Sequence, residues 1–480
     1  MILKDIISGL DAKASGITDI EIEGIAYDSR KVKKGFLFIA IKGYETDGHK
    51  YIESALKNGA VAVIGQEDLT LDCTYIKTDN SRRALAICAA QFYNHPEKKL
   101  KIIGITGTNG KTTTTYLIRQ ILMLKGTRCD LIGTNQIIIG NEEIESSRTT
   151  PESLDLFEIF SKMAESGGEY VVMEVSSHSL VLDRVYGVEF ETAIITNITQ
   201  DHLDFHKTMD EYAKAKAIMF TMCKTAAVNI DDEYKDIILK AAGKSAVTYG
   251  IKGNAAVKAE NIKMSERGVI FSITKNGETR EKRLGIPGEF SVYNALAAIC
   301  ACENIGVSEE DIEKGLVLAK PVKGRIEVVH VNTPYTVIID YAHTPDGLTN
   351  IISAVRGFAK KRVITLFGCG GNRDALKRPQ MGAIAEELSD LVVVTSDNPR
   401  CEEPYSIIED ILKGMKKDNH IVIENRREAI RHAMTIAEEG DIIILAGKGH
   451  ETYQEINHVK HDFDERVIVR EIYKGLAIGE

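Results

Sequence analysis

Residues 101–115 read KIIGITGTNGKTTTT, and the rest of the chain is organised around them. The isoleucines at the start of this stretch predict a short buried strand, and residues 112–125 carry apolar side chains at helix spacing. The glycine turn between the two places backbone N–H groups at a helix N-terminus, where the helix dipole favours an anion. Lys111 supplies a charge for the outer phosphates and Thr112 a hydroxyl for Mg²⁺. The stretch predicts a nucleotide-phosphate site, although Ile105 stands where the usual phosphate loop has glycine.

The chain has 480 residues, a net charge of −10 and no long basic block. This length predicts two to four domains, and the charge argues against nucleic acid as the main partner. No run of 18 apolar residues occurs, so no membrane insertion is expected. The N-terminal apolar stretch is too short and too charged for a signal peptide, and the eight cysteines lack zinc-site spacing. We therefore expect reduced thiols and a cytoplasmic location.

Alternating strand and helix patterns predict an α/β fold with three domains. Residues 1–97 are expected to form a small α/β domain, with strands at 35–41 and 60–64. Residues 98–323 are expected to form a central ATP-binding domain with a mainly parallel sheet, whose strands lie at 101–106, 170–175, 193–197, 226–230 and 246–249. Further expectations are helices at 152–166, 210–223 and 291–304 and a small antiparallel insertion at 255–287.

Residues 324–480 show the regular rhythm of a Rossmann-like, doubly wound domain. Its strands are expected at 336–340, 362–367, 391–395, 421–424 and 441–445. Ligands of such sheets bind beyond the carboxyl ends of the strands. The segments that follow the strands there are polar or glycine-rich, at 340–346, 368–373, 396–400 and 446–451.

A carboxylate, Glu174, interrupts an apolar strand pattern. An acid in this place near a phosphate loop helps to hold Mg²⁺, and the alternative is a glutamate at the strand end that faces solvent. Residues 201–206 hold two acids and two histidines, which favours a second Mg²⁺ site over a hydrolytic zinc site. Lys214 and Lys216 on the next helix read by themselves as solvated surface lysines.

Two guanidinium groups, those of Arg373 and Arg400, follow two strands of the third domain. The planar fork of an arginine suits a carboxylate ligand. Ordinary surface salt bridges are the alternative, and composition alone leaves both open.

Taken together, these motifs resemble those of the Mur ligase family, ATP-dependent enzymes that extend the peptidoglycan precursor peptide. The resemblance covers essentially the whole chain and includes the non-standard glycine spacing of the phosphate loop. Its markers are residues 107–113, 174–178, 201–204, 293–294, 324–327 and 340–346. Residues 397–404, DNPRCEEP, are similar to the signature of members that add meso-2,6-diaminopimelate to UDP-N-acetylmuramoyl-L-alanyl-D-glutamate.

The resemblance also implies which residues form each site. ATP would be bound by Gly107, Thr108, Asn109, Gly110, Lys111, Thr112, Thr113, Asn294, Arg325 and Asp340. The UDP-muramoyl dipeptide would be bound by Tyr27, Ser29, Tyr44, Glu45, Thr46, Thr149, Thr150, Ser176 and Arg184. Diaminopimelate would be bound by Arg373, Asp397, Asn398, Pro399, Arg400, Gly447 and Glu451. The catalytic residues would be Lys111, Glu174, His202 and Lys216. Two Mg²⁺ ions would be held by Thr112, Glu174, His202 and Lys216, the last as N6-carboxylysine.

The reaction that the resemblance implies is an amide ligation. The D-glutamyl carboxylate attacks the γ-phosphate of ATP, and the amino group of diaminopimelate then attacks the acyl phosphate. Three alternatives stay open: the same ligase with L-lysine or another diamino acid, a folylpolyglutamate-synthase-like ligase, and a nucleotide-dependent switch without ligase chemistry. We expect a monomer whose domains close around linkers near residues 97 and 323.

Overall fold

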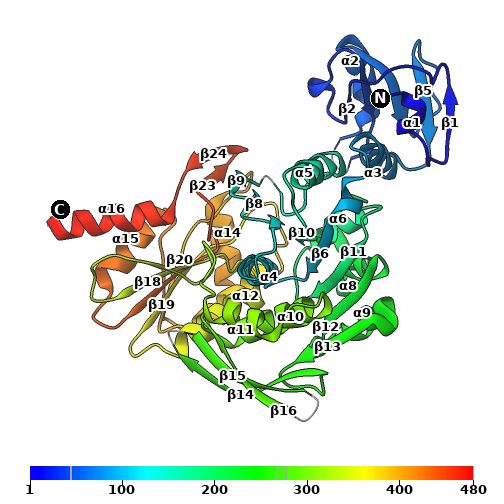
Figure 1. Ribbon diagram of the computed structural model, residues 1–480. Helices are drawn as coiled ribbons and strands as arrows, with labels where there is room; N and C mark the ends of the chain where they lie inside the picture. Colours follow the sequence, from blue (N-terminus) through cyan, green and yellow to red (C-terminus); the bar gives the residue numbers. More distant parts are fainter. Residues whose placement is uncertain (44–45, 147, 266–267, 276–277, 479–480) are drawn as a thin grey trace. The chain divides into compact units, whose positions relative to one another are not determined.

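Figure 1 shows the computed structural model, which describes residues 1–43, 46–146, 148–265, 268–275 and 278–478. The chain is a mixed α/β protein, as its alternating patterns predicted. It divides into two compact units. Unit 1 comprises Met1–Thr106, Gly126–Ile194 and Ala215–Ala226, and unit 2 comprises Gly107–Lys125, Ile195–Lys214 and Ala227–Glu480. The domain boundaries near residues 97 and 323 stay predictions.

The N-terminal sheet of unit 1 has the strand order β1-β5-β4-β3-β2. Strands β2 to β5 run parallel, and β1 pairs with β5 in the antiparallel direction. The strands predicted at 35–41 and 60–64 are confirmed as β3 and β4, which bury Phe38 and Val63. The elements are α1 (Leu3–Ile6), β1 (Ala12–Ser15), β2 (Gly24–Ala26), β3 (Phe36–Ile39), α2 (Ile52–Lys57), β4 (Ala60–Gly65), β5 (Thr74–Thr78) and α3 (Ser81–Phe92).

The rest of unit 1 is built on the predicted strand β6. Strand β10 pairs in parallel with β6 on one side and with β7 on the other. A Cβ atom at Gly104 in β6 would collide with the ring of Phe190, which explains the glycine in this buried strand. The elements are β6 (Lys101–Thr106), β7 (Cys129–Ile132), β8 (Gln136–Ile139), β9 (Glu142–Glu145), α5 (Ser153–Glu165), β10 (Tyr170–Glu174), α6 (Ser177–Val181) and β11 (Phe190–Ile195).

In unit 2, helix α4 follows the glycine turn and packs against α10 and α11. The predicted antiparallel insertion is confirmed, because β15 pairs in the antiparallel direction with both β14 and β16. The elements, with α8 and β12 shared between the units, are α4 (Lys111–Leu124), α7 (Leu203–His206), α8 (Met209–Ala217), β12 (Cys223–Asn229), α9 (Lys235–Ala242), β13 (Ala246–Gly250), β14 (Val257–Ser265), β15 (Gly268–Lys275), β16 (Glu278–Leu284), α10 (Glu289–Asn304) and α11 (Glu309–Val317).

The helix predicted at 210–223 is too long. Helix α8 ends at Ala217, Ile218–Thr221 is a 3-10 turn, and Cys223 already begins β12. The apolar side chains of Met219 and Phe220 are buried, and an apolar run of this length fits a buried turn as well as a helix.

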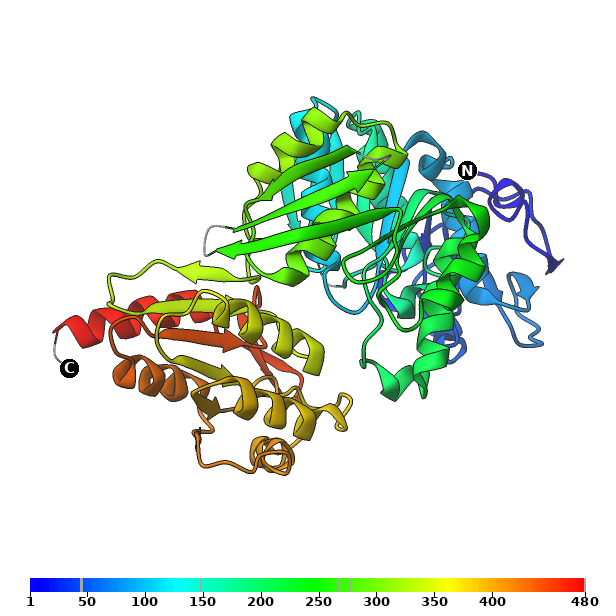
Figure 2. The ribbon, with the colours of Figure 1, turned by 90° about the horizontal axis from the view of Figure 1, so that it is seen from below.

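The C-terminal part of unit 2 is a six-stranded sheet of order β17-β18-β22-β19-β20-β21. The five predicted strands pair in parallel, and β17 adds an antiparallel edge. Helices α12, α13 and α14 pack on one face and α15 and α16 on the other, as Figure 2 shows in yellow to red. The elements are β17 (Glu327–Val329), β18 (Thr336–Asp340), α12 (Pro345–Arg356), β19 (Val363–Phe367), α13 (Lys377–Leu388), β20 (Leu391–Val394), α14 (Pro404–Leu412), β21 (His420–Val422), α15 (Arg426–Ile436), β22 (Ile442–Ala446), β23 (Tyr453–Ile456), β24 (Val459–Asp462) and α16 (Glu465–Ile478). Within the described residues, none of the helices has both the length and the apolar character that a membrane crossing requires.

Candidate active site

The glycine turn before α4 has the conformation that an anion site requires. Gly107 and Gly110 have φ angles of +141° and +85°, and Gly110 is the N-cap residue of α4. A Cβ atom on Gly107 would collide with Thr196 Oγ1, and one on Gly110 with Asn294 Oδ1. Lys111 Nζ donates to the carbonyl oxygens of Gly107 and Thr108 at 2.9 and 2.8 Å. The lysine is therefore held beside the helix N-terminus, where a phosphate group can replace these carbonyl groups.

The segment after β11 binds backbone groups of the glycine turn. Asn197 Oδ1 accepts a hydrogen bond from the N–H of Asn109 at 2.9 Å, and Thr196 Oγ1 donates to the carbonyl oxygen of Asn109 at 2.6 Å. The N–H of Thr108 donates to the carbonyl oxygen of Asn197 at 2.8 Å. Sequence reasoning missed Thr196 and Asn197 in this role, because only the fold brings residues so distant along the chain to the turn.

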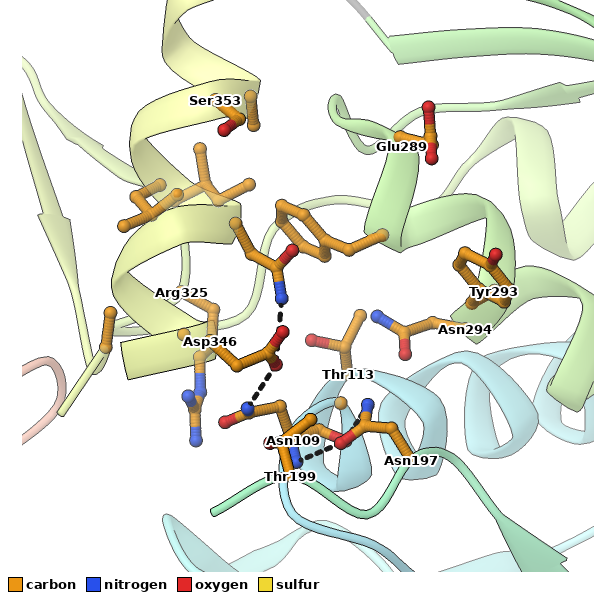
Figure 3. Close-up of a pocket in the computed structure, with 18 of the residues that line it drawn as sticks. Asn109, Thr113, Asn197, Thr199, Glu289, Tyr293, Asn294, Arg325, Asp346 and Ser353 are labelled. Atoms are coloured by element: carbon orange, nitrogen blue, oxygen red, sulfur yellow. Dashed lines mark hydrogen bonds between the residues drawn. The ribbon is translucent and has the colours of Figure 1, made fainter. Parts of the chain in front are cut away.

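A cavity of about 560 Å³ lies beside the turn in unit 2, and Figure 3 shows its lining. Its walls come from α4, α10, α12 and the segments after β11, β12 and β18. The predicted ATP-binding residues that line it are Asn109, Gly110, Thr112, Thr113, Asn294, Arg325 and Asp340. The polar lining residues that had not been assigned to ATP include Asn197, Thr199, Asp231, Asp232, Tyr293 and Asp346.

Two cavity carboxylates differ in their electrostatics. Burial raises the pKa of Asp340 above its usual value, against the charge of Arg325 and the N–H groups of Ile326 and Ala342. Burial also acts to raise the pKa of Asp231, but three backbone N–H groups and the Tyr293 hydroxyl outweigh it, and the net shift is downward. Asp231 is thus a stable anion in the wall of the cavity.

Arg325 connects the phosphate-loop helix α4 to the six-stranded C-terminal sheet, which is the third sheet in chain order. Its Nη2 donates to Thr112 Oγ1 at 3.5 Å, and its guanidinium carbon lies 4.7 Å from the centre of the Tyr341 ring. Because it is both stacked and hydrogen-bonded, the guanidinium is fixed at the edge of the cavity.

The predicted metal ligands are divided between the units. Glu174 in unit 1 is fully buried and accepts hydrogen bonds from the N–H and the hydroxyl of Thr134, both at 2.9 Å. Lys216 in unit 1 is 1% exposed, so its interpretation as a surface lysine is wrong, while that of Lys214 is confirmed. Thr112 and His202 belong to unit 2. The grouping of these ligands around metal ions therefore stays a prediction.

Beside His202 lies a buried acid, Asp201, which belongs to the cluster of acids and histidines predicted to form a metal site. Asp201 Oδ2 lies 3.4 Å from Nε2 of His202, and Asp201 Oδ1 lies 3.6 Å from Nζ of the buried Lys377. Burial raises the pKa of Asp201, but the neighbouring His202, His343 and Lys377 hold it well below its usual range.

In unit 1, several predicted substrate residues lie together. The hydroxyl of Thr150 donates to the carbonyl oxygen of Glu174 at 2.9 Å and accepts from the N–H of Ser176 at 3.1 Å. Arg184 Nη1 donates to the carbonyl oxygen of Thr150 at 3.2 Å, and its Nε lies 3.3 Å from Glu152. Thr149 shares a hydroxyl–hydroxyl hydrogen bond of 3.0 Å with Thr134.

The other predicted residues of this group lie at the N-terminal sheet. The Tyr27 hydroxyl donates to Asp155 at 2.7 Å, and Ser29 is buried. The carbonyl oxygen of Thr46 accepts from Gly43 at 2.9 Å, whereas Tyr44 and Glu45 lie outside the described residues. Asp155 was not predicted, because nothing in its local sequence separates it from the other polar residues of a surface helix.

The predicted diaminopimelate residues gather at the ends of β20 and β22. Asn398 Nδ2 donates to Glu451 Oε2 at 2.8 Å, and Arg400 Nη1 donates to the carbonyl oxygen of Gly371 at 2.8 Å. Asp397 Oδ2 is buried and has no hydrogen-bond partner among the described residues, and a Cβ on Gly447 would meet it at 2.6 Å. Arg373 follows β19 and donates to the carbonyl oxygen of Asn372 at 3.2 Å. Pro399 joins Asn398 to Arg400, whose φ is +53°.

A fully buried lysine, Lys448, connects this group. Its Nζ donates to Asn398 Oδ1 at 3.0 Å and lies 3.3 Å from Glu451 Oε2. Burial and the charge of Asp397 raise the pKa of Glu451, while Lys448 and Asn398 oppose the shift. The glycine on each side of Lys448 was the only sequence signal for its role.

The phosphate turn and the cavity beside it define a nucleotide-phosphate-binding α/β protein. Three family models match the chain: the catalytic domain of the Mur ligase family at residues 21–97, the Mur ligase middle domain at 105–302 and the Mur ligase glutamate ligase domain at 324–449. The chain belongs to the Mur ligase family and is an enzyme of the ligase class.

Relatives and solved structures agree with this family. UDP-N-acetylmuramoyl-L-alanyl-D-glutamate–2,6-diaminopimelate ligase of Clostridium tetani is 49% identical over 99% of this chain and 100% of its own length. The ligase of the same name of Clostridium botulinum is 51% identical over 95% of this chain and 96% of its own. A solved structure of a ligase of that name superposes with a TM-score of 0.70 at 32% identity over 99% of both chains. MurF of Thermotoga maritima, solved with ADP, shares the fold with a TM-score of 0.64 at 19% identity, over 95% of this chain and 98% of its own.

Proposed function

We propose that this chain joins meso-2,6-diaminopimelate to UDP-N-acetylmuramoyl-L-alanyl-D-glutamate and converts ATP to ADP and phosphate. The observation that carries the proposal is the group formed by Asn398, Lys448 and Glu451 beside Arg400. In such a group Arg400 offers a cation for a carboxylate and Glu451 an anion for an ammonium, the two charges at the far end of a diamino diacid. The names of the relatives support the same substrates.

The phosphate loop would hold ATP through its backbone N–H groups, with Lys111 exchanging loop carbonyls for phosphate oxygens. The substrate carboxylate attacks the γ-phosphate, and an acyl phosphate forms as ADP leaves. The amino group of diaminopimelate then attacks the acyl carbon, and phosphate leaves as the amide forms. A carboxylate and a triphosphate repel each other, so fixed cations such as Lys111 lower the barrier by offsetting that repulsion.

The chemistry of Thr112, Glu174, His202 and Lys216 fits Mg²⁺. Glu174 and Lys216 are both buried, and a buried charge requires a partner of opposite sign. Carboxylation of Lys216 would replace the ammonium with an anionic oxygen ligand of the kind that Mg²⁺ prefers. When bound, Mg²⁺ would neutralise charge on the transferring phosphoryl group.

Specificity for diaminopimelate over L-lysine follows from its second carboxylate. Lysine has only an ammonium at its far end, so it would leave Arg400 without a ligand partner. Because the three proposed substrate sites lie on one chain, we also propose that the active form is a monomer. We further propose that it acts in the cytoplasm, where ATP is present.

The test is phosphate release with the UDP-muramoyl dipeptide, comparing meso-diaminopimelate with L-lysine. We expect release that depends on both the dipeptide and diaminopimelate, with an amide product detected by mass spectrometry. Equal rates with L-lysine would contradict diaminopimelate as the specific amino acid but would still support the ligase activity. Release that ignores the amino acid would favour a nucleotide switch, and activity only with folyl substrates would favour a folylpolyglutamate-synthase-like ligase.

A further inference from the structure

Asn109, in the middle of the phosphate loop, is held from two directions. Its backbone N–H and carbonyl are bound by Asn197 and Thr196, as described above for the segment after β11. Its side chain points away from these partners, and Nδ2 donates to Asp346 Oδ2 at 2.7 Å (Figure 3). The same amide nitrogen lies 3.4 Å from Thr344 Oγ1. The side chain of Asn109 therefore binds the third sheet's first helix, α12.

Asp346 occupies the first turn of α12, after the N-cap residue Thr344. Its Oδ2 also accepts a hydrogen bond from Asn350 Nδ2 at 3.1 Å, one helical turn further on. Burial raises the pKa of this carboxyl, while its hydrogen bonds with Asn109 and Asn350 oppose the shift. Asp346 lines the cavity and is fixed by groups from α12 and the phosphate loop.

An acid in the wall of a cavity that receives a triphosphate cannot serve as a ligand for phosphate, because the two anions repel each other. The contact that the structure shows is with the phosphate loop, so Asp346 can act on the phosphate site through Asn109. The residue next to Asn109 is Gly110, which begins the row of N–H groups at the N-terminus of α4. A loss of the Asp346 contact would release the Asn109 side chain and loosen those N–H groups.

We propose that Asp346 is a positioning residue that fixes the phosphate loop through Asn109, and that it thereby couples the third sheet to nucleotide binding. The hydrogen bond between them is charge-assisted and partly buried, so its loss should cost more than that of a neutral surface bond. The inference goes beyond the proposed reaction, because it concerns how the nucleotide site is assembled, whichever amino acid is joined.

The test is a double-mutant cycle on the full chain, with ATP affinity measured by calorimetry and phosphate release by steady-state kinetics. Asp346→Ala should raise the dissociation constant of ATP about tenfold, the loss expected for one charge-assisted hydrogen bond. Asn109→Ala should do the same, and the double variant should be no worse than either one. Asp346→Asn keeps an acceptor oxygen and should restore ATP binding to within about threefold of the unchanged chain.

Asn350→Ala is the matched comparison, because it removes the other hydrogen bond to the same oxygen and shortens another side chain in the cavity wall without touching the loop. It should leave ATP affinity within about twofold of the unchanged chain. In Asp346→Ala the KM of the dipeptide should stay constant while that of ATP rises, and the amides of residues 107–113 should exchange faster with deuterium. Three outcomes would overturn the proposal. The losses of ATP affinity could be additive in the double variant, Asn350→Ala could lose as much affinity as Asp346→Ala, or Asp346→Ala could bind ATP as the unchanged chain does. If Asp346→Ala does not fold, Asp346→Asn and Asn109→Ala carry the test. Failure of the proposed function would instead appear as phosphate release without any dependence on the amino acid.

Discussion

Arg400 donates from Nε to Oε2 of Glu455 at 3.1 Å. The two residues are also joined through the backbone, since the N–H of Arg400 donates to the carbonyl oxygen of Glu455 at 3.0 Å. The guanidinium that we assign to a substrate carboxylate is therefore already paired with a carboxylate of the β23–β24 hairpin. A ligand must share Arg400 with Glu455 or displace it.

Arg400→Ala should raise the KM of diaminopimelate at least about tenfold and leave ATP affinity within about twofold, because it removes one charge-assisted contact after β20 and leaves the phosphate loop unchanged. The measurement is phosphate release with each substrate varied in turn. Equal losses for both substrates would contradict the assignment. Glu455→Gln is the matched variant: it removes the competing charge, so the KM of diaminopimelate should stay the same or fall.

Gly110→Ala should lower nucleotide affinity by at least about tenfold, because a φ of +85° strains alanine and its Cβ would meet Asn294. Gly126→Ala is the control, since Gly126 has the same φ of +85° but open space around its Cβ. Strain alone should then cost about 1 kcal/mol of unfolding free energy and spare binding. ATP titration and thermal unfolding of both variants measure this difference, and equal nucleotide affinity in the two variants would exclude the collision.

Lys216→Ala should abolish most of the activity, and high bicarbonate or a small added acid should restore part of it. The expectation rests on the proposed carbamate and on burial, because Lys216 is 1% exposed and lies in the interior rather than at the surface. Rates with and without added formate or acetate provide the measurement. Lys214→Ala, at an exposed lysine paired with Glu211 at 2.7 Å, should change little. If no added acid restores activity, the proposed carbamate on Lys216 would be contradicted, whereas the proposed ligase activity would not.

His450 should contribute to the fall in the free energy of unfolding at acid pH. Burial, assisted by the charges of Arg325 and Arg466, lowers its pKa to about 3 from 6.5. Below pH 6.5 His450 is protonated in the unfolded chain but stays neutral in the folded chain. The unfolding free energy therefore falls by up to about 1.4 kcal/mol per pH unit toward pH 3. His450→Gln should remove this contribution. Urea unfolding of both proteins from pH 7 to 4 measures it, and parallel pH profiles would refute the prediction.

The strands that carry the site were predictable from the sequence because their signals are local. The isoleucines of β6 and the helix-spaced apolar residues of α4 require only their immediate neighbours to form a buried strand and a buried helix face. Polar elements were missed for the same reason. The hairpin β23–β24 is mostly exposed and carries no apolar alternation, yet it delivers Glu455 to Arg400.

The sequence by itself determined the α/β class, because strand and helix patterns are local. It also determined the phosphate turn, because glycine, lysine and hydroxyl groups at a helix start act within one turn of chain. Only the tertiary structure decided which distant groups meet that turn. The burial of Lys216 depends on how the chain packs. The hydrogen bonds from Arg400 to Glu455 and from Asn109 to Asp346 join residues that are far apart in the chain. Such contacts are set by how the sheets and helices pack, and the residue types alone leave many partners equally suitable.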